Sequence, residues 1–92
     1  MINDAIVEFS KKAIHRPGVD LYRMDDAIEL IRLCEKHNIS VLGIDSFTIY
    51  DNKIQPSLEN SIDLSNENDC YTLALEFLTK IENTDFVYEI VY

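Results

Sequence analysis

The chain is poor in glycine, cysteine and basic residues, and it has no tryptophan. Neither of its two glycines, Gly18 and Gly43, lies in a glycine-rich phosphate loop, so nucleotide binding by that route is excluded. Its two cysteines, Cys34 and Cys70, each lie within an apolar, helix-like pattern. A zinc site needs a close pair of Cys or His ligands, and a secreted disulfide framework usually needs more cysteines. We therefore predict two buried free thiols, no metal site and no cofactor.

The N-terminal segment lacks the features of a secretion signal. It reads Met-Ile-Asn-Asp-Ala-Ile-Val-Glu, with acidic residues where a signal peptide carries basic ones. No apolar run approaches the length that a membrane-spanning helix requires. Together with the small number of cysteines, these features predict a cytoplasmic protein that does not enter a membrane.

Acidic side chains outnumber basic ones about two to one. Eight Lys and Arg residues face 17 Asp and Glu residues, which gives a formal net charge of −9 for 92 residues. A field of this sign repels nucleic acids and anionic membranes and speeds encounter with basic protein surfaces. The same charge also keeps a small protein soluble, so it does not identify a partner by itself.

The chain contains enough apolar material for a single domain over residues 1–92. Hydrophobic residues make up 47% of the sequence, which can build one core. Their spacing predicts a helix over Ile2 to Ile14 that begins after a cap at Asn3. This helix must end before Pro17-Gly18, and Val19 to Arg23 then forms a connector.

Two further helices follow from the same spacing. One begins at Asp25 or Asp26 and ends at His37-Asn38, because asparagine readily adopts the left-handed conformation that closes a helix. The other begins near Glu67, after a polar cap. Each presents one apolar stripe, and we expect both stripes to pack on a sheet.

The segment from Ile39 to Tyr50 is predicted to be a strand, since it is rich in β-branched and aromatic residues and has no helical period. Both of its alternating sets are apolar, which is typical of an interior strand. Gly43 within it indicates a bulge or a close backbone approach. The turn Asp51-Asn52-Lys53 leads into a second strand over Lys53 to Ser57, which Pro56 places at the sheet edge.

The remaining segments complete the predicted fold. Leu58 to Asn68 is polar and is expected to be irregular, whereas Asp85 to Tyr92 alternates as a third strand. The element order predicts an α+β domain with about three helices on a small three-stranded, mainly antiparallel sheet of order 2-1-3. We expect Phe47, Ile28 and Phe77 to share one core, because strand and helix stripes must bury against each other.

The sequence offers little for catalysis. His15 follows the first helix beside a proline turn and His37 ends the second helix, so both are interpreted as surface or capping residues and we predict no enzyme. Asp45 is a candidate binding residue, because a charge within an apolar strand is costly unless it is paired or turned to solvent. The alternative is an edge-facing or partnered aspartate that limits aggregation.

Four more candidates cluster in the sequence around the predicted hairpin. Tyr50 and Asp51 lie at its tip, and Glu59 and Asp63 lie in the segment that follows. Segments of this kind often carry recognition, because their side chains have no packing duties; the alternative is a solvated loop. With Asp45, these four residues make up the predicted partner-binding set.

Several motifs fall in a characteristic order. Asp25-Asp26-Ala27 begins a helix, Val41-Leu42-Gly43 and Asp45 lie in a strand, and Lys53-Ile54 and Pro56 lie in the return strand. Over about residues 21 to 92 this order resembles small bacterial immunity proteins of polymorphic toxin systems. The chain differs from that family in having Ile44 in place of a second glycine and Glu59-Asn60-Ser61 in place of an Asp-Asn-Trp element.

The resemblance implies a protein that binds a cognate toxin, commonly a nuclease, and blocks its active site or an adjacent surface. The acidic charge agrees with this, because a groove that holds phosphates is basic. Two alternatives remain. One is a regulatory or adaptor module that binds a cellular protein through an exposed sheet edge. The other is a small enzyme with two converging carboxylates in a deep pocket.

Overall fold

The computed structural model describes residues 3–82 and 85–92 and has the predicted α+β fold. The elements along the chain are α1 (Asp4–Phe9), the short 3-10 helix η1 (Ser10–Lys12), β1 (Ile14–Arg16), β2 (Val19–Leu21), α2 (Met24–Lys36), β3 (Gly43–Tyr50), β4 (Lys53–Asp63), α3 (Cys70–Thr79) and β5 (Phe86–Val91). No helix of the described residues is both long and apolar enough to cross a membrane.

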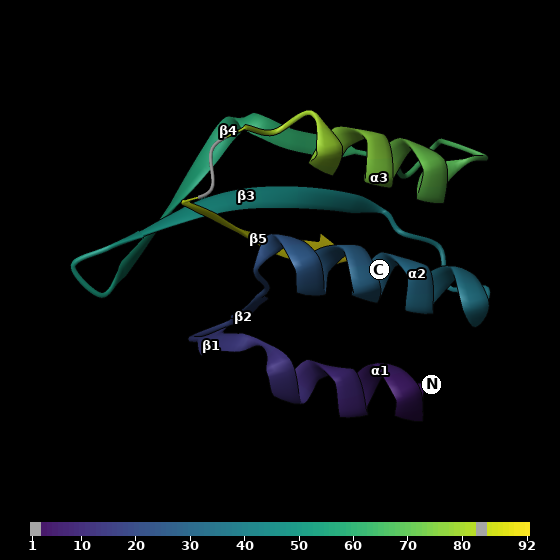
Figure 1. Cartoon of the computed structure of the whole chain (residues 1–92), viewed down its shortest axis with the longest axis horizontal. Coiled ribbons are helices and arrows are strands. Elements are labelled where there is room, and N and C mark those ends of the chain that lie inside the picture. The colour runs from purple at the N-terminus through teal and green to yellow at the C-terminus, as the bar shows by residue number, and fades with distance from the viewer. Residues whose placement is uncertain (1–2, 83–84) are drawn as a thin grey trace.

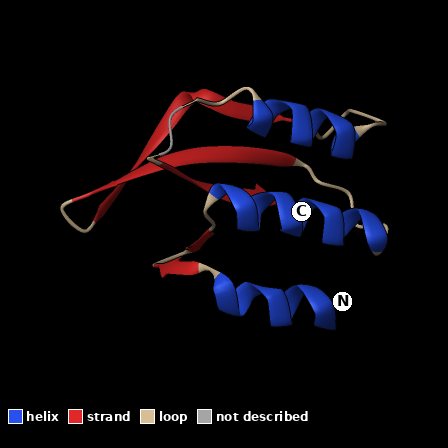
Figure 2. Ribbon diagram, viewed as in Figure 1, coloured by secondary structure: helices blue, strands red, loops and turns tan. Residues whose placement is uncertain are grey.

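The main sheet consists of β4, β3 and β5, all antiparallel, with β3 in the centre. The predicted order 2-1-3 is therefore confirmed, and so is the edge position of the strand that contains Pro56. Helices α2 and α3 lie side by side along the sheet, and α1 lies beside α2 (Figure 1). The β3–β4 hairpin reaches past the ends of the helices, so its turn projects from the body of the molecule (Figure 2).

The N-terminal part differs from the prediction. Asn3 caps α1 as expected, since its Oδ1 accepts a hydrogen bond from the backbone N–H of Ala5 at 2.8 Å. The helix ends at Phe9, well before Ile14, and Ile2 lies outside the described residues. The predicted connector is wrong, because β1 and β2 form a hairpin around Pro17-Gly18. Gly18 has a φ of +77°, which glycine adopts at little cost and which lets two residues reverse the chain.

This hairpin joins the main sheet through β5. The backbone N–H of Tyr22 donates to the carbonyl oxygen of Tyr88, and the N–H of Tyr88 donates to the carbonyl oxygen of Tyr22, both at 2.8 Å. Through these two bonds, Tyr22 pairs with Tyr88 as one antiparallel bridge, which holds the β1–β2 hairpin against the edge of β5.

Helix α2 agrees with its predicted stripe. Ala27, Leu30, Ile31 and Cys34 are buried, and the acidic first turn complements the positive end of the helix. Asn38 closes the helix with a φ of 56°. Helix α3 begins at Cys70 rather than near Glu67, and the described structure gives its N-cap residue no side-chain capping bond.

The face of β3 that points into the core is not the predicted one. Ile44 and Ser46 are fully buried, whereas Phe47 is half-buried and lies opposite Val87 on the other face. Ile28 and Phe77 do pack against the core, so only the expectation for Phe47 is wrong. The physical reason is that both alternating sets of this strand are apolar, so hydrophobicity alone does not choose between them.

Strand β4 is longer than predicted, and the expectation of an irregular segment after Ser57 is wrong. Pairing with β3 continues to Asp63, interrupted by a bulge between Ser57 and Ile62. Within the bulge, the Asn60 side-chain amide donates to Oγ of Ser57 at 2.9 Å, and Oγ of Ser61 donates to the Ser57 carbonyl at 3.1 Å. These local bonds explain how a polar stretch remains in a strand, because they satisfy groups that the interrupted pairing leaves open.

Both cysteines are free and buried, as predicted. Burial raises the pKa of the Cys34 thiol to about 11, and nearby Cys70 adds to the shift. A rise from 9.0 to about 11 leaves about a hundredfold less reactive thiolate at neutral pH. We expect thiol labelling of the native protein to be slow and to become fast in denaturant, as measured by mass spectrometry. Rapid labelling of both native cysteines would contradict their burial.

Candidate functional site

The turn between β3 and β4 presents Tyr50 and Asp51 to solvent. Asp51 and Asn52 have φ values of 52° and 63°, which a two-residue hairpin turn requires and which Asp and Asn tolerate. Tyr50 is 78% exposed. The expected positive-φ turn is confirmed, and its tip combines an aromatic side chain with a carboxylate in neighbouring positions.

Glu59 and Asp63 are exposed further along β4. Asp63 Oδ1 accepts a hydrogen bond from the backbone N–H of Ser65 at 2.9 Å, and hydrogen bonds from this residue lower the pKa of the Asp63 carboxyl. Asp63 pairs with Gly43, at the opposite end of β3 from the turn that holds Asp51. At about 3.3 Å per residue, the length of β3 separates these two carboxylates by roughly 20 Å. The predicted acidic residues therefore do not form one patch, and their binding role stays a prediction.

Asp45 lies in the central strand, so its interpretation as an edge charge is wrong. It is directly opposite Glu89 on β5, on the sheet face that Ile44 and Ser46 do not share. Like charges in directly opposed positions repel each other. Burial raises the pKa of the Glu89 carboxyl, and the charges of Asp45 and Asp20 raise it further.

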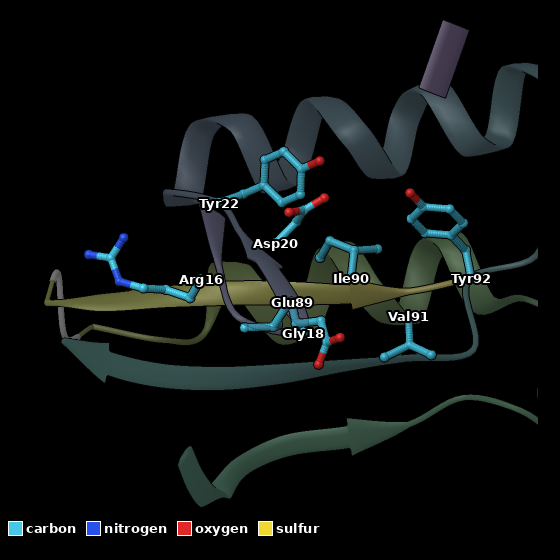
Figure 3. Close-up of a pocket in the computed structure, with 9 residues that line it drawn as sticks. Arg16, Gly18, Asp20, Tyr22, Glu89, Ile90, Val91 and Tyr92 are labelled. Atoms are coloured by element: carbon cyan, nitrogen blue, oxygen red, sulfur yellow. The ribbon is translucent and has the colours of Figure 1, made fainter. Parts of the chain in front are cut away.

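A surface hollow of about 480 Å³ lies between the β1–β2 hairpin and the C-terminal end of β5, and we call it the β2–β5 hollow (Figure 3). Its lining residues are Arg16, Gly18, Val19, Asp20, Tyr22, Glu89, Ile90, Val91 and Tyr92. The main-chain bonds between Tyr22 and Tyr88 hold its two walls together. The backbone therefore fixes the position of the hairpin relative to β5 at the hollow.

Three polar groups gather on one side of the β2–β5 hollow. Figure 3 shows the Asp20 carboxylate next to the ring of Tyr22, with the hydroxyl ends of Tyr22 and Tyr92 directed toward each other. Burial raises the pKa of Tyr22 to about 12, and Tyr92 and Asp20 contribute to the rise. Burial also raises the pKa of Tyr92, with contributions from Cys34 and Asp20. Both phenols therefore stay protonated at neutral pH and share the field of one carboxylate.

The charged neighbours leave this side of the hollow acidic. His15 Nδ1 lies 2.7 Å from Asp20 Oδ1, which occupies one oxygen of that carboxylate. The guanidinium of Arg16 donates to the His15 carbonyl at 3.0 Å and points away from Asp20 (Figure 3). Glu89 points to the other side of β5, toward β3, so the two carboxylates of the hollow do not converge (Figure 3).

Sequence reasoning missed this hollow because it assigned Val19 to Arg23 to a connector. Two signals were available. Pro17-Gly18 lies between short segments that carry Ile14 and Leu21, a pattern that favours a hairpin. Glu89 is an acidic residue within an apolar strand, as is Asp45, which was singled out for that reason.

Comparisons with protein-family models, with curated proteins and with solved structures give no significant match for this chain. Its function is therefore inferred from its own residues. Among the residues that the structure describes, no three Asp, Glu, His or Cys side chains are placed to hold a metal ion.

Proposed function

We propose that this chain is an immunity protein that binds a basic cognate toxin, and that this toxin is a nuclease. The chain neutralises the toxin in the cytoplasm and catalyses no reaction itself. The strand motifs that resemble such proteins lie on one continuous unit, whereas Asp25-Asp26-Ala27 lies in the first turn of α2. Val41-Leu42-Gly43 leads into β3, and Lys53-Ile54 and Pro56 lie on β4, which pairs with it. This placement supports the proposal because the strand motifs and the predicted contact residues share one hairpin.

The observation that carries the proposal is the projecting β3–β4 turn of an acidic protein. Tyr50 is largely exposed next to Asp51, and the turn extends beyond the helices (Figure 1). A tyrosine supplies a rigid amphipathic anchor, and a carboxylate beside it complements a basic surface. A narrow turn can enter a groove that the body of the protein cannot, which suits a partner whose active site is a basic cleft.

Expression with a toxin tests this function directly. The toxin is the product of the reading frame immediately upstream, expressed alone and together with this chain in the same host. We expect growth to stop with the toxin alone and to recover with both proteins, which should also purify as a complex. A neighbouring product that is not toxic, or toxicity that the chain does not relieve, would contradict the proposal.

The acidic residues of the β3–β4 pair should act mainly on the rate of association. In the triple variant Asp51→Asn, Glu59→Gln, Asp63→Asn, we expect slower association with the toxin and a weaker dependence on salt. The reason is that exposed charges steer encounter and are screened over about 10 Å at 0.1 M salt. Stopped-flow fluorescence at several salt concentrations measures both effects. A triple variant that associates at the wild-type rate at low salt would show that these are only solvated residues.

One feature favours the alternative of an adaptor module that binds a cellular protein. Strand β4 is an edge strand, and Leu58 in its bulge is 84% exposed. Edge strands accept extended peptides through main-chain hydrogen bonds. A Leu58→Asp variant distinguishes the two functions, because it should abolish edge binding and leave a turn-mediated complex with the toxin intact.

A further inference from the structure

We infer that the β2–β5 hollow binds a lysine or arginine side chain of the partner through Asp20, Tyr22 and Tyr92. This inference rests on the proposed function, which supplies a basic protein partner, and it names a second contact surface away from the β3–β4 turn. The partner would then touch the chain at the projecting turn and at the N-terminal hairpin.

The strongest observation is the state of the Tyr22 hydroxyl. Tyr22 is only 3% exposed, and its ring packs against that of Phe9 with centroids 5.7 Å apart. Its side chain nevertheless lines the hollow, and within the described chain its hydroxyl makes no hydrogen bond. The hydroxyl is not among the fully buried polar atoms, so it opens into the hollow and its hydrogen-bonding capacity is available to a ligand there.

The surrounding groups decide the charge of that ligand. The hydroxyl of Tyr92 is directed toward that of Tyr22, and the Asp20 carboxylate lies next to the Tyr22 ring (Figure 3). Beyond these, Asp26 adds its negative field to Tyr22. Phenol oxygens and a carboxylate can accept the hydrogen bonds that an ammonium or guanidinium group donates, so the ligand is a cation.

Two basic residues of the chain itself face this region, and neither replaces that ligand. His15 engages one oxygen of Asp20, which leaves the second oxygen as an acceptor. Arg16 is turned toward the His15 carbonyl. The hollow, at about 480 Å³, is in the lower part of the range for ligand sites, and it suits a side chain that enters from an open surface.

A short basic peptide tests the site independently of the toxin. We would titrate the ¹⁵N-labelled chain with acetylated tetralysine amide and follow the backbone amide signals by NMR. Saturable shifts are expected at residues 19–22 and 89–92. The double variant Tyr22→Phe, Tyr92→Phe keeps both rings and should bind about tenfold more weakly, because two hydrogen bonds are lost. Equal binding by this folded double variant would overturn the inference.

A charge-matched control separates the site from the general acidic field. Asp20→Asn and Glu76→Gln each remove one negative charge, but Glu76 is exposed on α3, away from the hairpin. Asp20→Asn should weaken peptide binding about tenfold, since it removes a charge-assisted bond, while Glu76→Gln should change it less than about twofold. Equal weakening by both variants, or shifts spread over the whole acidic surface, would overturn the inference.

The toxin assay then keeps this inference distinct from the proposed function. If the chain protects cells, Asp20→Asn should weaken the complex with the toxin about as much as it weakens peptide binding. Protection that Asp20→Asn leaves unchanged would overturn the assignment of the hollow to the toxin while preserving the immunity function. Specific peptide binding without protection would preserve the cation site and overturn the proposed function.

Discussion

Replacement of Ile44 by alanine is expected to destabilise the fold by about 2–5 kcal/mol, the usual cost of emptying a core isoleucine site. Ile44 is fully buried in the central strand, between Ile62 on β4 and Ile90 on β5. Its removal therefore leaves a cavity with strands on both sides, which the surrounding backbone cannot easily close. Urea unfolding measures the loss as a lower midpoint at an unchanged slope.

Phe47→Ala is the matched control for the orientation of β3. Phe47 is half-buried and lies on the other face of the strand, so its truncation should cost less than Ile44→Ala although the side chain is larger. The reverse ranking would mean that β3 presents its other face to α2 and α3, because a shift of one residue exchanges the two faces.

The sequence alone did not predict which face of β3 is buried. Both alternating sets of this strand are apolar, so the local pattern did not determine which set faces the core, and the expectation for Phe47 was wrong. The structure buries Ser46 instead, and its hydroxyl has no hydrogen-bond partner among the described residues. In this strand, the helix residues that share the core with Ile44 determine which face is buried, and that information is not local to residues 39–50.

The helix α2 was predictable for the opposite reason. Its apolar residues fall on a single stripe, and its end is marked by an asparagine that adopts positive φ. The hairpin turn at Asp51-Asn52 was predictable in the same way, because the turn type demands those residues. Local chemistry determines both features, whatever the rest of the chain does.

The β2–β5 hollow depends on residues far apart in the sequence. Asp20 and Tyr22 come from the N-terminal hairpin, whereas Glu89 and Tyr92 come from the end of the chain. They meet because Tyr22 and Tyr88 exchange backbone hydrogen bonds. No local sequence pattern predicts a bridge of this kind. The predicted binding residues show the opposite relation. Asp51 and Asp63 are close in sequence, but the eight residues of β3 separate them in the fold.

Replacement of Gly43 by alanine is expected to destabilise the fold by a net amount of about 1–2 kcal/mol. A Cβ atom at this position would lie 2.8 Å from the backbone carbonyl oxygen of Ile62, a contact that real Cβ atoms do not make. Forcing atoms into a packed site costs about 1–3 kcal/mol, whereas replacing glycine gains only about 0.4–1 kcal/mol through the unfolded chain. The clash involves β4 backbone, so no side-chain rotation relieves it.

Gly18→Asn is the control that separates this close approach from backbone strain. No atom lies within 4 Å of the position that a Gly18 Cβ would take, so any loss of stability in Gly18→Asn reflects the strain of its positive φ and not a clash. Asparagine adopts this conformation more readily than most residues, so we expect a smaller loss than in Gly43→Ala. Urea unfolding of both variants measures the difference. If Gly43→Ala is as stable as wild type, β4 can shift away from β3. If it is destabilised as expected, the glycine of Val41-Leu42-Gly43 is required for strand pairing, and that part of the motif reports on the fold rather than on the partner.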